Sequence, residues 1–366
     1  MTDEKPNRTK AIVQSVISIG LLVVIFGFIL PGLIDFNVVW AAIKDLSWGE
    51  VAALLAGAAF LWFTLGWEFA AARPGLGIPR GTLAWLSSTC WANLIPLPFD
   101  IAVRFGMYRF WGFTAEQFGI STVMSGIWTV FIKLGLPVVA VGAQVAMGRD
   151  APDWLLVLSA VGAVALAVGV GTFVGVIRSL TFAQKVGAIG SNVVNKVLTL
   201  VRKPTIDDIE DRVLDLRENA SDTIKSRWLM LSIANVFEIA ANVALLTMAL
   251  RFVGVNAETL SWVDVFTGYS IVLLVTVIPI TPGGVGVAAV VYIWTFSQLA
   301  NVEASGMSKE VLESTMGAAV FVYRIVTWLL VIPVGFAAQF IWRWRVKRKT
   351  GVDPIKAVTS GYVAPA

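Results

Sequence analysis

The sequence predicts an all-α polytopic membrane protein, with about six full membrane spans and two broken re-entrant hairpins arranged as an inverted repeat. Of its 366 residues, 57% are hydrophobic and only 14% are charged, whereas soluble proteins contain about 25% charged residues. The mean hydropathy is +0.79. The apolar runs are about 20 residues long, which is typical of membrane helices and not of the shorter, alternating strands of a β-barrel.

The composition also excludes several kinds of site. The chain contains no His and a single Cys, Cys90, so a Ser-His triad, a His-ligated metal and a disulfide within the chain are excluded. No Gly-rich phosphate loop ending in Lys-Ser/Thr occurs. We therefore expect no metal, no cofactor and no nucleic-acid partner, and we expect that the protein is not an enzyme.

The spans follow from the apolar runs. Residues 11–34 follow a basic segment and form a run longer than the apolar core of about 7–15 residues in a signal peptide, so we expect an uncleaved first span. Further spans are predicted at residues 51–72, 118–147, 154–177, 228–250 and 316–342.

The positions of Lys and Arg predict the orientation of these spans. Basic residues are abundant in the N-terminal tail, at Arg73 and Arg80, between residues 178 and 203, and between residues 343 and 349. Such residues collect in cytoplasmic loops. We therefore expect a multi-pass protein of the cell (inner) membrane with both termini in the cytoplasm, and with the short loops before residue 51 and near residue 150 outside.

This orientation requires two hairpins. The apolar piece that begins at residue 83 must enter and leave from the cytoplasmic side, in a hairpin near residues 83–104. The piece at residues 263–299 must enter from the outside and return there.

The two hairpins share a sequence pattern. Residues 95–103 (IPLPFDIAV) resemble residues 278–287 (IPITPGGVGV) if one inserted residue is allowed. Paired Gly/Pro-interrupted segments in inverted repeats mark the binding sites of many secondary transporters. The alternative is that these Pro and Gly residues only terminate helices.

Four regions are predicted on this basis. Residues 1–177 form the first membrane half, residues 178–227 a cytoplasmic amphipathic insert, residues 228–349 the second membrane half, and residues 350–366 a cytoplasmic tail. The insert has a basic amphipathic first part suited to an anionic leaflet, and a second part that starts at Thr205. We expect a surface helical hairpin, and docking of a partner is the alternative.

Ionisable residues at membrane depth are the candidate functional residues, because each costs about 2.5–3.5 kcal/mol to insert. Arg104 and Arg324 are expected to bind an anionic headgroup, because a guanidinium pairs with phosphate through two parallel hydrogen bonds. The acidic candidates are Glu68, Asp100 and Glu238, and Lys133 also lies at this depth. The alternative is internal ion pairing, of Arg104 with Asp100 or Glu238 and of Arg324 with Glu68.

Three glycines complete the candidate site. Gly283, Gly284 and Gly286 follow Pro282 and are expected to open a half-helix whose free backbone N–H groups bind an anion. Close helix packing is the alternative role for these glycines.

These motifs together resemble the flippase-like membrane domain of lysylphosphatidylglycerol synthases. The resemblance rests on the Pro-x₅-Arg element that ends at Arg104, on Pro279 with the segment 282–287, on Tyr323-Arg324 and on Pro333-x-Gly335. It implies an integral membrane protein that moves lipids or lipid-linked sugars between leaflets.

The sequence departs from the pattern of the family at three points. Ala288-Ala289 stand where relatives usually have Glu, and Ala102 stands where a Gly is expected before Arg104. The residues after Lys349 are too few for the aminoacyl-transferase domain of some relatives, so we expect a stand-alone membrane domain.

The leading hypothesis is therefore translocation of an anionic phospholipid or a lipid-linked sugar between leaflets, with anionic membrane lipids as partners. One alternative is a membrane-embedded lipid-modifying enzyme that uses Asp100 or Glu238 as its general base. The other is a non-catalytic partner of a lipid-synthesis enzyme, docked through the insert.

Overall fold

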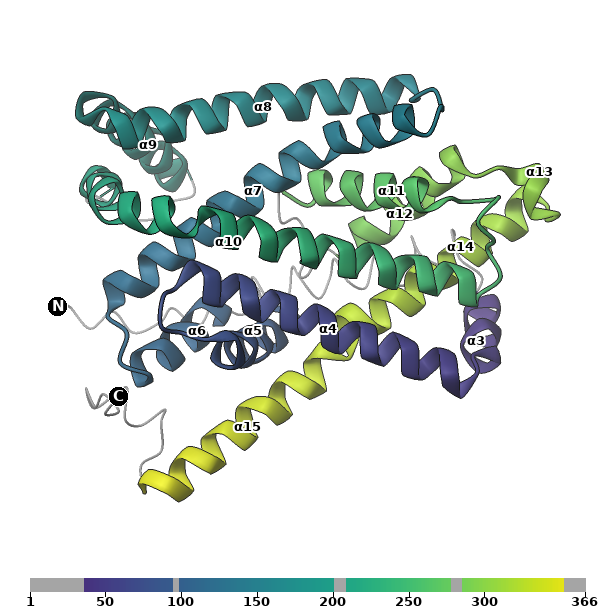
Figure 1. Ribbon diagram of the computed structural model, residues 1–366, viewed down its shortest axis with the longest axis horizontal. Coiled ribbons are helices and arrows are strands. Elements are labelled where there is room, and N and C mark those ends of the chain that lie inside the picture. Colours follow the sequence, from purple (N-terminus) through teal and green to yellow (C-terminus); the bar gives the residue numbers. More distant parts are fainter. Residues whose placement is uncertain (1–35, 95–98, 201–208, 278–284, 352–366) are drawn as a thin grey trace.

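The computed structural model describes residues 36–94, 99–200, 209–277 and 285–351, and in these ranges all regular structure is helical (Figure 1). Five helical stretches of the described ranges are long and apolar enough to cross a membrane. The predicted class, an all-α polytopic membrane protein, is confirmed. The first expected span, at residues 11–34, lies outside the described residues.

The five stretches agree with the five later predicted spans. They are α4 (Trp48–Ala72), α7 (Ala115–Ala146), α8 (Asp153–Arg178), the Arg227–Phe252 part of α10, and Lys309–Arg348. Helix α4 begins earlier than hydropathy alone indicates, because Ser47 and Glu50 form a capping box in which the Glu50 amide donates to the Ser47 hydroxyl at 3.3 Å. Thr114 and Gln117 cap α7 in the same way.

The polar insert is continuous with the membrane-length helices. Helix α9 (Leu180–Leu200) follows α8 directly, but α10 (Ile209–Phe252) runs without a break through Arg227 and into the membrane-length stretch. The boundary expected at residue 227 therefore falls inside a helix, and Thr205 lies outside the described residues. Because α9 packs on both α8 and α10, the insert is joined to the bundle at both ends.

Two helical hairpins break the pattern of long helices. The first consists of α5 (Ile78–Ala92) and α6 (Phe99–Phe110), and the second of α11 (Trp262–Val275) and α12 (Val285–Leu299); the helices of each pair pack on each other. The linking residues 95–98 and 278–284 lie outside the described residues.

The hairpins enter the bundle from opposite ends. Helix α5 begins where α4 ends, and α6 ends where α7 begins. The second hairpin begins and ends at the other end of α7, since Gln144 of α7 contacts Asp264 of α11, and the Asn301 amide, just after α12, donates to the Thr259 carbonyl at 2.9 Å.

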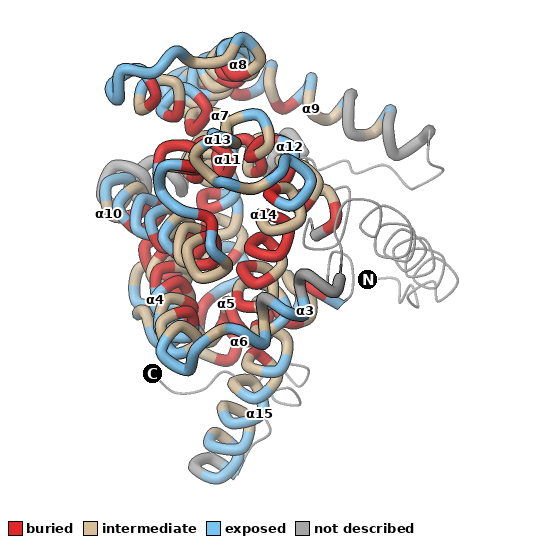
Figure 2. The backbone as a smooth tube through the Cα atoms, turned by 90° about the vertical axis from the view of Figure 1, so that its right-hand side faces the viewer, coloured by how far each residue is buried: buried red, intermediate tan, exposed pale blue. Residues whose placement is uncertain are grey.

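Helices α4 and α10 cross the middle of the molecule, with α7 and α8 on one side and α15 (Val331–Thr350) extending on the other (Figure 1). The main apolar core joins α4, α10, α11, α12 and α14 (Lys309–Arg324). Figure 2 shows that burial concentrates in these inner helices, whereas α8 is exposed along much of its length. Short helices α3 (Phe36–Asp45) and α13 (Val302–Ser305) lie at the end opposite the first hairpin.

Helices α4 and α5 touch backbone to backbone. A Cβ atom built on Gly66 would lie 2.5 Å from the Thr82 nitrogen and 2.6 Å from the Thr82 Cα, and Gly81 faces the Gly66 carbonyl. Only glycine permits such a close approach. This contact fixes the first hairpin against the central helix.

The last long helix contains a wide turn. Residues Ile325–Leu329 form a π-helix, η3, in which the Leu330 amide donates to the Ile325 carbonyl at 2.8 Å. The Asn93 side-chain amide, at the end of α5, donates to the Trp328 carbonyl at 3.0 Å. Beyond the wide turn, α15 packs on α5, where the rings of Trp91 and Phe336 lie 5.0 Å apart.

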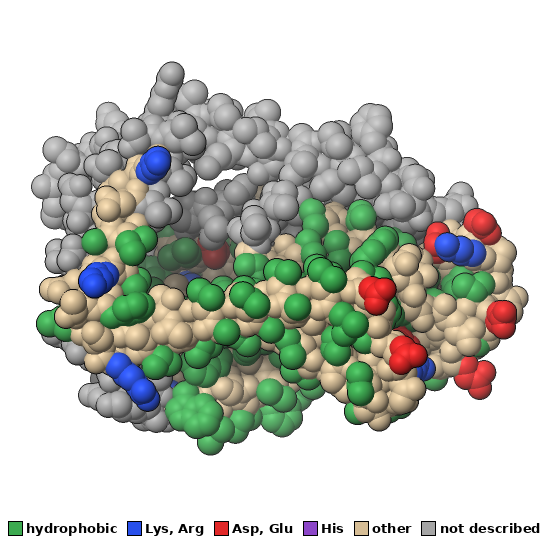
Figure 3. All heavy atoms as spheres, turned by 90° about the horizontal axis from the view of Figure 1, so that it is seen from above, with side chains coloured by type: hydrophobic (Ala, Val, Ile, Leu, Met, Phe, Trp, Pro, Cys, Tyr) green, Lys and Arg blue, Asp and Glu red, His purple; other side chains and the backbone are tan. Residues whose placement is uncertain are grey.

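Charge is segregated along the bundle. Seen from above, Lys and Arg side chains gather mainly at the end where α8 meets α9, Asp and Glu gather mainly at the other end, and hydrophobic side chains lie between them (Figure 3). We call these the basic end and the acidic end. The first hairpin enters from the basic end and the second from the acidic end.

Candidate functional site

A buried carboxylate is at the centre of the site. Glu68 of α4 is 5% exposed, and its Oε1 accepts hydrogen bonds from the hydroxyls of Ser125 and Thr129 of α7, the latter at 3.5 Å. Lys133 of α7 and Arg104 of α6 both interact electrostatically with it. Helices of the first hairpin and of two spans therefore meet at one carboxylate.

Arg104 lies against aromatic rings. Its guanidinium carbon is 4.8 Å from the centre of the Phe69 ring and 5.6 Å from that of Phe118. Electrostatic interaction also joins it to Asp100, in the first turn of α6. The Nε of Arg104 and one carboxylate oxygen of Asp100 are buried, and neither has a hydrogen-bond partner among the described residues.

Arg324 lies in a different group, at the end of α14 and next to the π-helix. It lies within electrostatic range of three buried phenols, those of Tyr269, Tyr292 and Tyr323, which are three of the five tyrosines in the chain. The Tyr323 hydroxyl donates to the Asn242 side-chain oxygen of α10 at 2.8 Å. The buried Nε of Arg324 has no hydrogen-bond partner in the described part of the chain.

Glu238 of α10 connects the two groups. It interacts electrostatically with Glu68 and Lys133 on one side, and with Tyr269 and Tyr323 on the other. Polar groups therefore continue from the Arg104 group through Glu238 to the Arg324 group.

The ion pairs considered from the sequence are not formed at contact distance. Within the described ranges, neither Arg104 nor Arg324 has a carboxylate oxygen within 4.0 Å. Electrostatic interactions with more distant carboxylates offset part of the cost of burying Arg104.

The glycine segment is seen only in part. Gly286 is buried in the first turn of α12, whereas Gly283 and Gly284 lie outside the described residues. Ala288 and Ala289, where the family resemblance implies Glu, are packed in the main core at 0% and 7% exposure. The acidic groups of the site come from α4, α6 and α10 instead.

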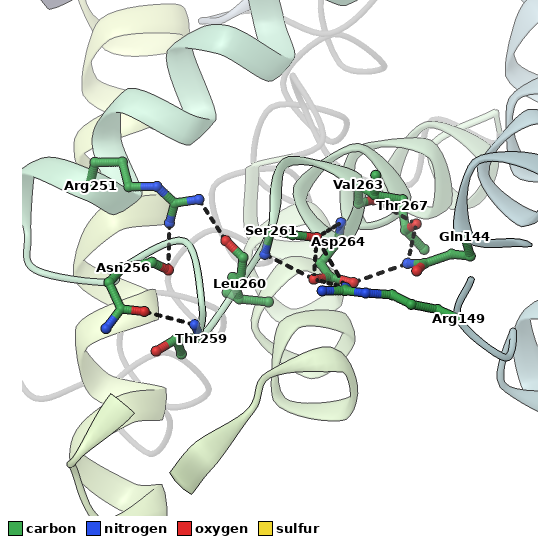
Figure 4. A network of polar contacts seen from close by, with 10 residues as sticks. All are labelled: Gln144, Arg149, Arg251, Asn256, Thr259, Leu260, Ser261, Val263, Asp264 and Thr267. Atoms are coloured by element: carbon green, nitrogen blue, oxygen red, sulfur yellow. Dashed lines mark hydrogen bonds and ion pairs between the residues drawn. The ribbon is translucent and has the colours of Figure 1, made fainter. Parts of the chain in front are cut away.

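A second polar network fastens the second hairpin at the acidic end (Figure 4). Asp264, which is 3% exposed at the start of α11, accepts hydrogen bonds from Arg149 at 2.7 Å, from Gln144 at 3.0 Å and from the Ser261 hydroxyl at 2.6 Å. Nearby, Arg251 donates to the carbonyls of Val255, Asn256 and Leu260 at 2.6–2.8 Å. The Asp264 carboxylate and the Arg251 guanidinium are hydrogen-bonded within the protein, so these two groups hold structure. The buried Thr259 hydroxyl has no hydrogen-bond partner among the described residues.

We expect Asp264→Asn to destabilise the protein by about 1–3 kcal/mol, because the ion pair with Arg149 is lost and an amide cannot accept all these bonds. Thermal unfolding in detergent measures the effect. Asp150→Asn, at an exposed position of the same end, is the matched control and should leave the melting temperature unchanged. Equal melting temperatures for both variants would contradict a clamp at Asp264.

Several residues of the site were not identified from the sequence as site residues. Ser125 and Thr129 are two of these. Together with Lys133, which was already a candidate because of its depth, they follow one another at four-residue spacing, which places a polar stripe on one face of an otherwise apolar helix. Such a polar stripe in the sequence could have indicated that these residues face a buried polar site. Tyr269 and Tyr292 carry no comparable local signal, because they reach Arg324 only through the packing of α11, α12 and α14.

In the described part of the chain, no three His, Cys, Asp or Glu side chains come together as metal ligands. Among known families, the lysylphosphatidylglycerol synthase TM region matches residues 12–335. The matched range includes both hairpins, the insert and the wide turn. No curated protein matches the chain significantly.

Proposed function

Because this chain belongs to the lysylphosphatidylglycerol synthase TM region family, whose members act on membrane lipids, we propose that it moves an anionic phospholipid or a lipid-linked sugar from one leaflet to the other. The observation that supports the proposal most is the chain of polar groups between Arg104 and Arg324. It lies in the interior of the bundle, where most buried side chains are apolar.

The chemistry of the two arginines suits this task. An anionic headgroup cannot cross a hydrocarbon core unless its charge is compensated along the way. A guanidinium pairs with phosphate oxygens through a planar fork of N–H donors. In the proposed path the headgroup passes from Arg104 to Arg324 along Glu68, Lys133 and Glu238, while the acyl chains stay in the bilayer.

In this proposal the basic end faces the cytoplasm of a cell (inner) membrane, together with both termini, following the tendency of Lys and Arg to remain inside. Each hairpin is then re-entrant, the first from the cytoplasmic leaflet and the second from the outer leaflet. The first turn of α12, which begins at Val285, would offer backbone N–H groups to the same headgroup.

The orientation makes a direct prediction. In a Cys90→Ala background, Gly190→Cys on α9 should react with a membrane-permeant thiol reagent but stay protected from an impermeant one added to intact cells. A cysteine at the exposed Asp150 serves as the matched external site and should react with both reagents. Labelling of position 190 from outside would refute the orientation.

Reconstitution tests the function itself. Purified protein is placed in liposomes that carry leaflet-specific fluorescent lipids of several headgroups, with and without a proton gradient. We expect faster exchange of at least one anionic lipid than in protein-free liposomes. If no lipid is exchanged, translocation is ruled out under these conditions; if mass spectrometry instead finds chemically altered lipid, the protein is a lipid-modifying enzyme.

A further inference from the structure

Two buried hydrogen-bond donors lie on one face of the helix that carries Arg324. The Nε atom of Arg324 and the indole Nε1 atom of Trp328 are both buried, and neither has a hydrogen-bond partner among the described residues. The two residues are four positions apart in the continuous helix formed by α14, η3 and α15. Side chains at this spacing are neighbours, with Cβ atoms about 5–6 Å apart. The two unused donors therefore belong to adjacent side chains.

The wide turn explains how Trp328 is held in place. In η3 the Ile325 carbonyl accepts from the amide five residues later, that of Leu330, at 2.8 Å. In this pattern the partner of the Trp328 carbonyl would be residue 333, which is Pro and has no N–H group. The Asn93 side chain supplies a donor instead, at 3.0 Å, from the end of α5. A residue of the first hairpin therefore fixes the backbone from which the indole projects.

Two other tryptophans show how an indole supports the fold. Nε1 of Trp128 on α7 donates to the Ser232 hydroxyl on α10 at 3.0 Å, and Nε1 of Trp91 on α5 donates to the Gln339 side chain on α15 at 3.2 Å. The Trp328 indole makes no such bond with the described residues. A buried donor without an acceptor costs stability, and a ligand that accepts from it removes that cost.

The surroundings of Arg324 combine one positive charge with neutral groups. Three buried phenols lie within its electrostatic range, and no carboxylate oxygen lies within 4.0 Å of it in the described ranges. Glu238, which interacts with two of these phenols, also interacts with Lys133, a group of opposite charge. A ligand with one negative charge and more than one acceptor oxygen would match this composition.

We propose that Arg324 and Trp328 together bind the phosphodiester group of a lipid, with the guanidinium on one non-bridging oxygen and the indole N–H on the other. A phosphodiester carries a single negative charge on these two oxygens, which suits one guanidinium and one neutral donor. A phosphate monoester or a diphosphate carries further charge, which a neutral indole does not compensate. Trp328 is then a specificity-determining residue. Its role in transport rests on the proposed function, whereas the binding of a phosphodiester does not.

The test is binding of soluble probes to the purified full-length protein in a non-ionic detergent, measured by isothermal titration calorimetry at pH 8. The probes are dihexanoyl phosphatidylglycerol, which is a phosphodiester, dihexanoyl phosphatidic acid, which is a monoester with a second pKa of about 6, and glycerophosphoglycerol, a diester without acyl chains. Trp328→Phe removes the N–H group and keeps an aromatic ring. Trp128→Phe is the matched control, because that indole N–H is already bonded within the protein.

We expect Trp328→Phe to weaken binding of the phosphatidylglycerol probe about tenfold, whereas Trp128→Phe should stay within about twofold of the unmodified protein. Stability without ligand should move the other way. Both variants lose the same ring volume, but only Trp128→Phe breaks a hydrogen bond, so Trp328→Phe should have the higher melting temperature of the two. If Trp328 only supports the fold, Trp328→Phe will melt no higher than Trp128→Phe and bind the probe as the unmodified protein does.

The indole N–H signals of protein labelled with ¹⁵N-tryptophan give a readout that needs no substitution in the titrated protein. The Trp328 signal, identified by its loss in Trp328→Phe, should move downfield on addition of the phosphatidylglycerol probe, while the Trp128 signal stays in place. If Trp328→Phe is not recovered as folded protein, the titration still decides the question. Absence of downfield movement in every indole signal would overturn the subsite.

The other probes test which ligand the subsite takes. Tighter binding of phosphatidylglycerol than of phosphatidic acid supports the match to a single charge, and the opposite order would overturn it. Tighter binding of the lipid than of glycerophosphoglycerol identifies a membrane lipid as the ligand, and equal binding identifies a soluble phosphodiester, which rejects the lipid assignment. The liposome assay separates the two proposals. Absence of lipid exchange in a protein whose binding depends on Trp328 rejects translocation alone, whereas exchange with Trp328-independent binding rejects the subsite alone.

Discussion

Replacement of Arg324 or Arg104 by Gln should lower the rate of anionic-lipid exchange in liposomes by about 10- to 100-fold. Each guanidinium is partly buried and has no ion pair within 4.0 Å in the described ranges. In the proposed mechanism, the lost contact is a charge-assisted one worth about 1.5–3 kcal/mol to the headgroup as it crosses. Lys at either position keeps the charge without the planar fork and should lower the rate less.

The comparison must be made at matched amounts of folded protein. Arg345→Gln, at an exposed position of α15, removes the same charge outside the path and is expected to exchange lipid at the unmodified rate. If Arg104 and Arg324 only support the fold, the Gln variants will instead show lower yield and melting temperature with unchanged exchange per folded molecule. Unchanged exchange of every anionic lipid tested would end the headgroup-binding hypothesis.

Gly66→Ala should destabilise the protein by about 3 kcal/mol or prevent its recovery as folded protein, the largest stability effect that we expect for a single methyl group. The added Cβ would lie 2.5 Å from the Thr82 nitrogen, and backbone atoms cannot move aside as a side chain can. The whole of α5 would have to shift away from α4, at the upper end of the costs known for overpacking. Recovery of monodisperse protein and its melting temperature measure the effect.

Gly126→Ala on α7 is the matched control, because a Cβ at that helical glycine meets nothing within 4 Å. This control should be neutral or slightly stabilising, since alanine favours the helix. If Gly66→Ala is as stable as Gly126→Ala, the two helices separate at little cost, and the first hairpin is not fixed by this contact.

The long apolar helices could be predicted from the sequence because membrane spans depend on local composition. Hydropathy located α4, α7 and α8 to within a few residues, and their ends differ where capping by Ser47 or Thr114 extends the helix. The hairpins followed from the order of basic loops along the chain. These inferences need no knowledge of which helix packs on which.

The parts that could not be predicted depend on contacts between distant segments. The separation of Arg104 and Arg324 into two groups joined through Glu238 reflects the packing of α10 against α4 and α11. The continuity of α10 through Arg227 was missed because the polar composition before that residue resembles a surface helix. Likewise, nothing local in residues 325–329 indicates a π-helix, which Asn93 contacts from another helix.

That wide turn has a consequence for the register of the last helix. A π-turn carries one residue more than the α-helical repeat, so it rotates every following side chain by about 100° around the axis. The face of α14 that packs on the main core and the face of α15 that packs on α5 therefore lie at different angles around the axis of one continuous helix. Deleting a single residue between 325 and 329 would leave the hydropathy of the span intact, yet it would turn Phe336 and Gln339 away from Trp91. The π-turn therefore sets which side chains of this helix face the main core and which face α5. Hydropathy alone does not determine this rotation.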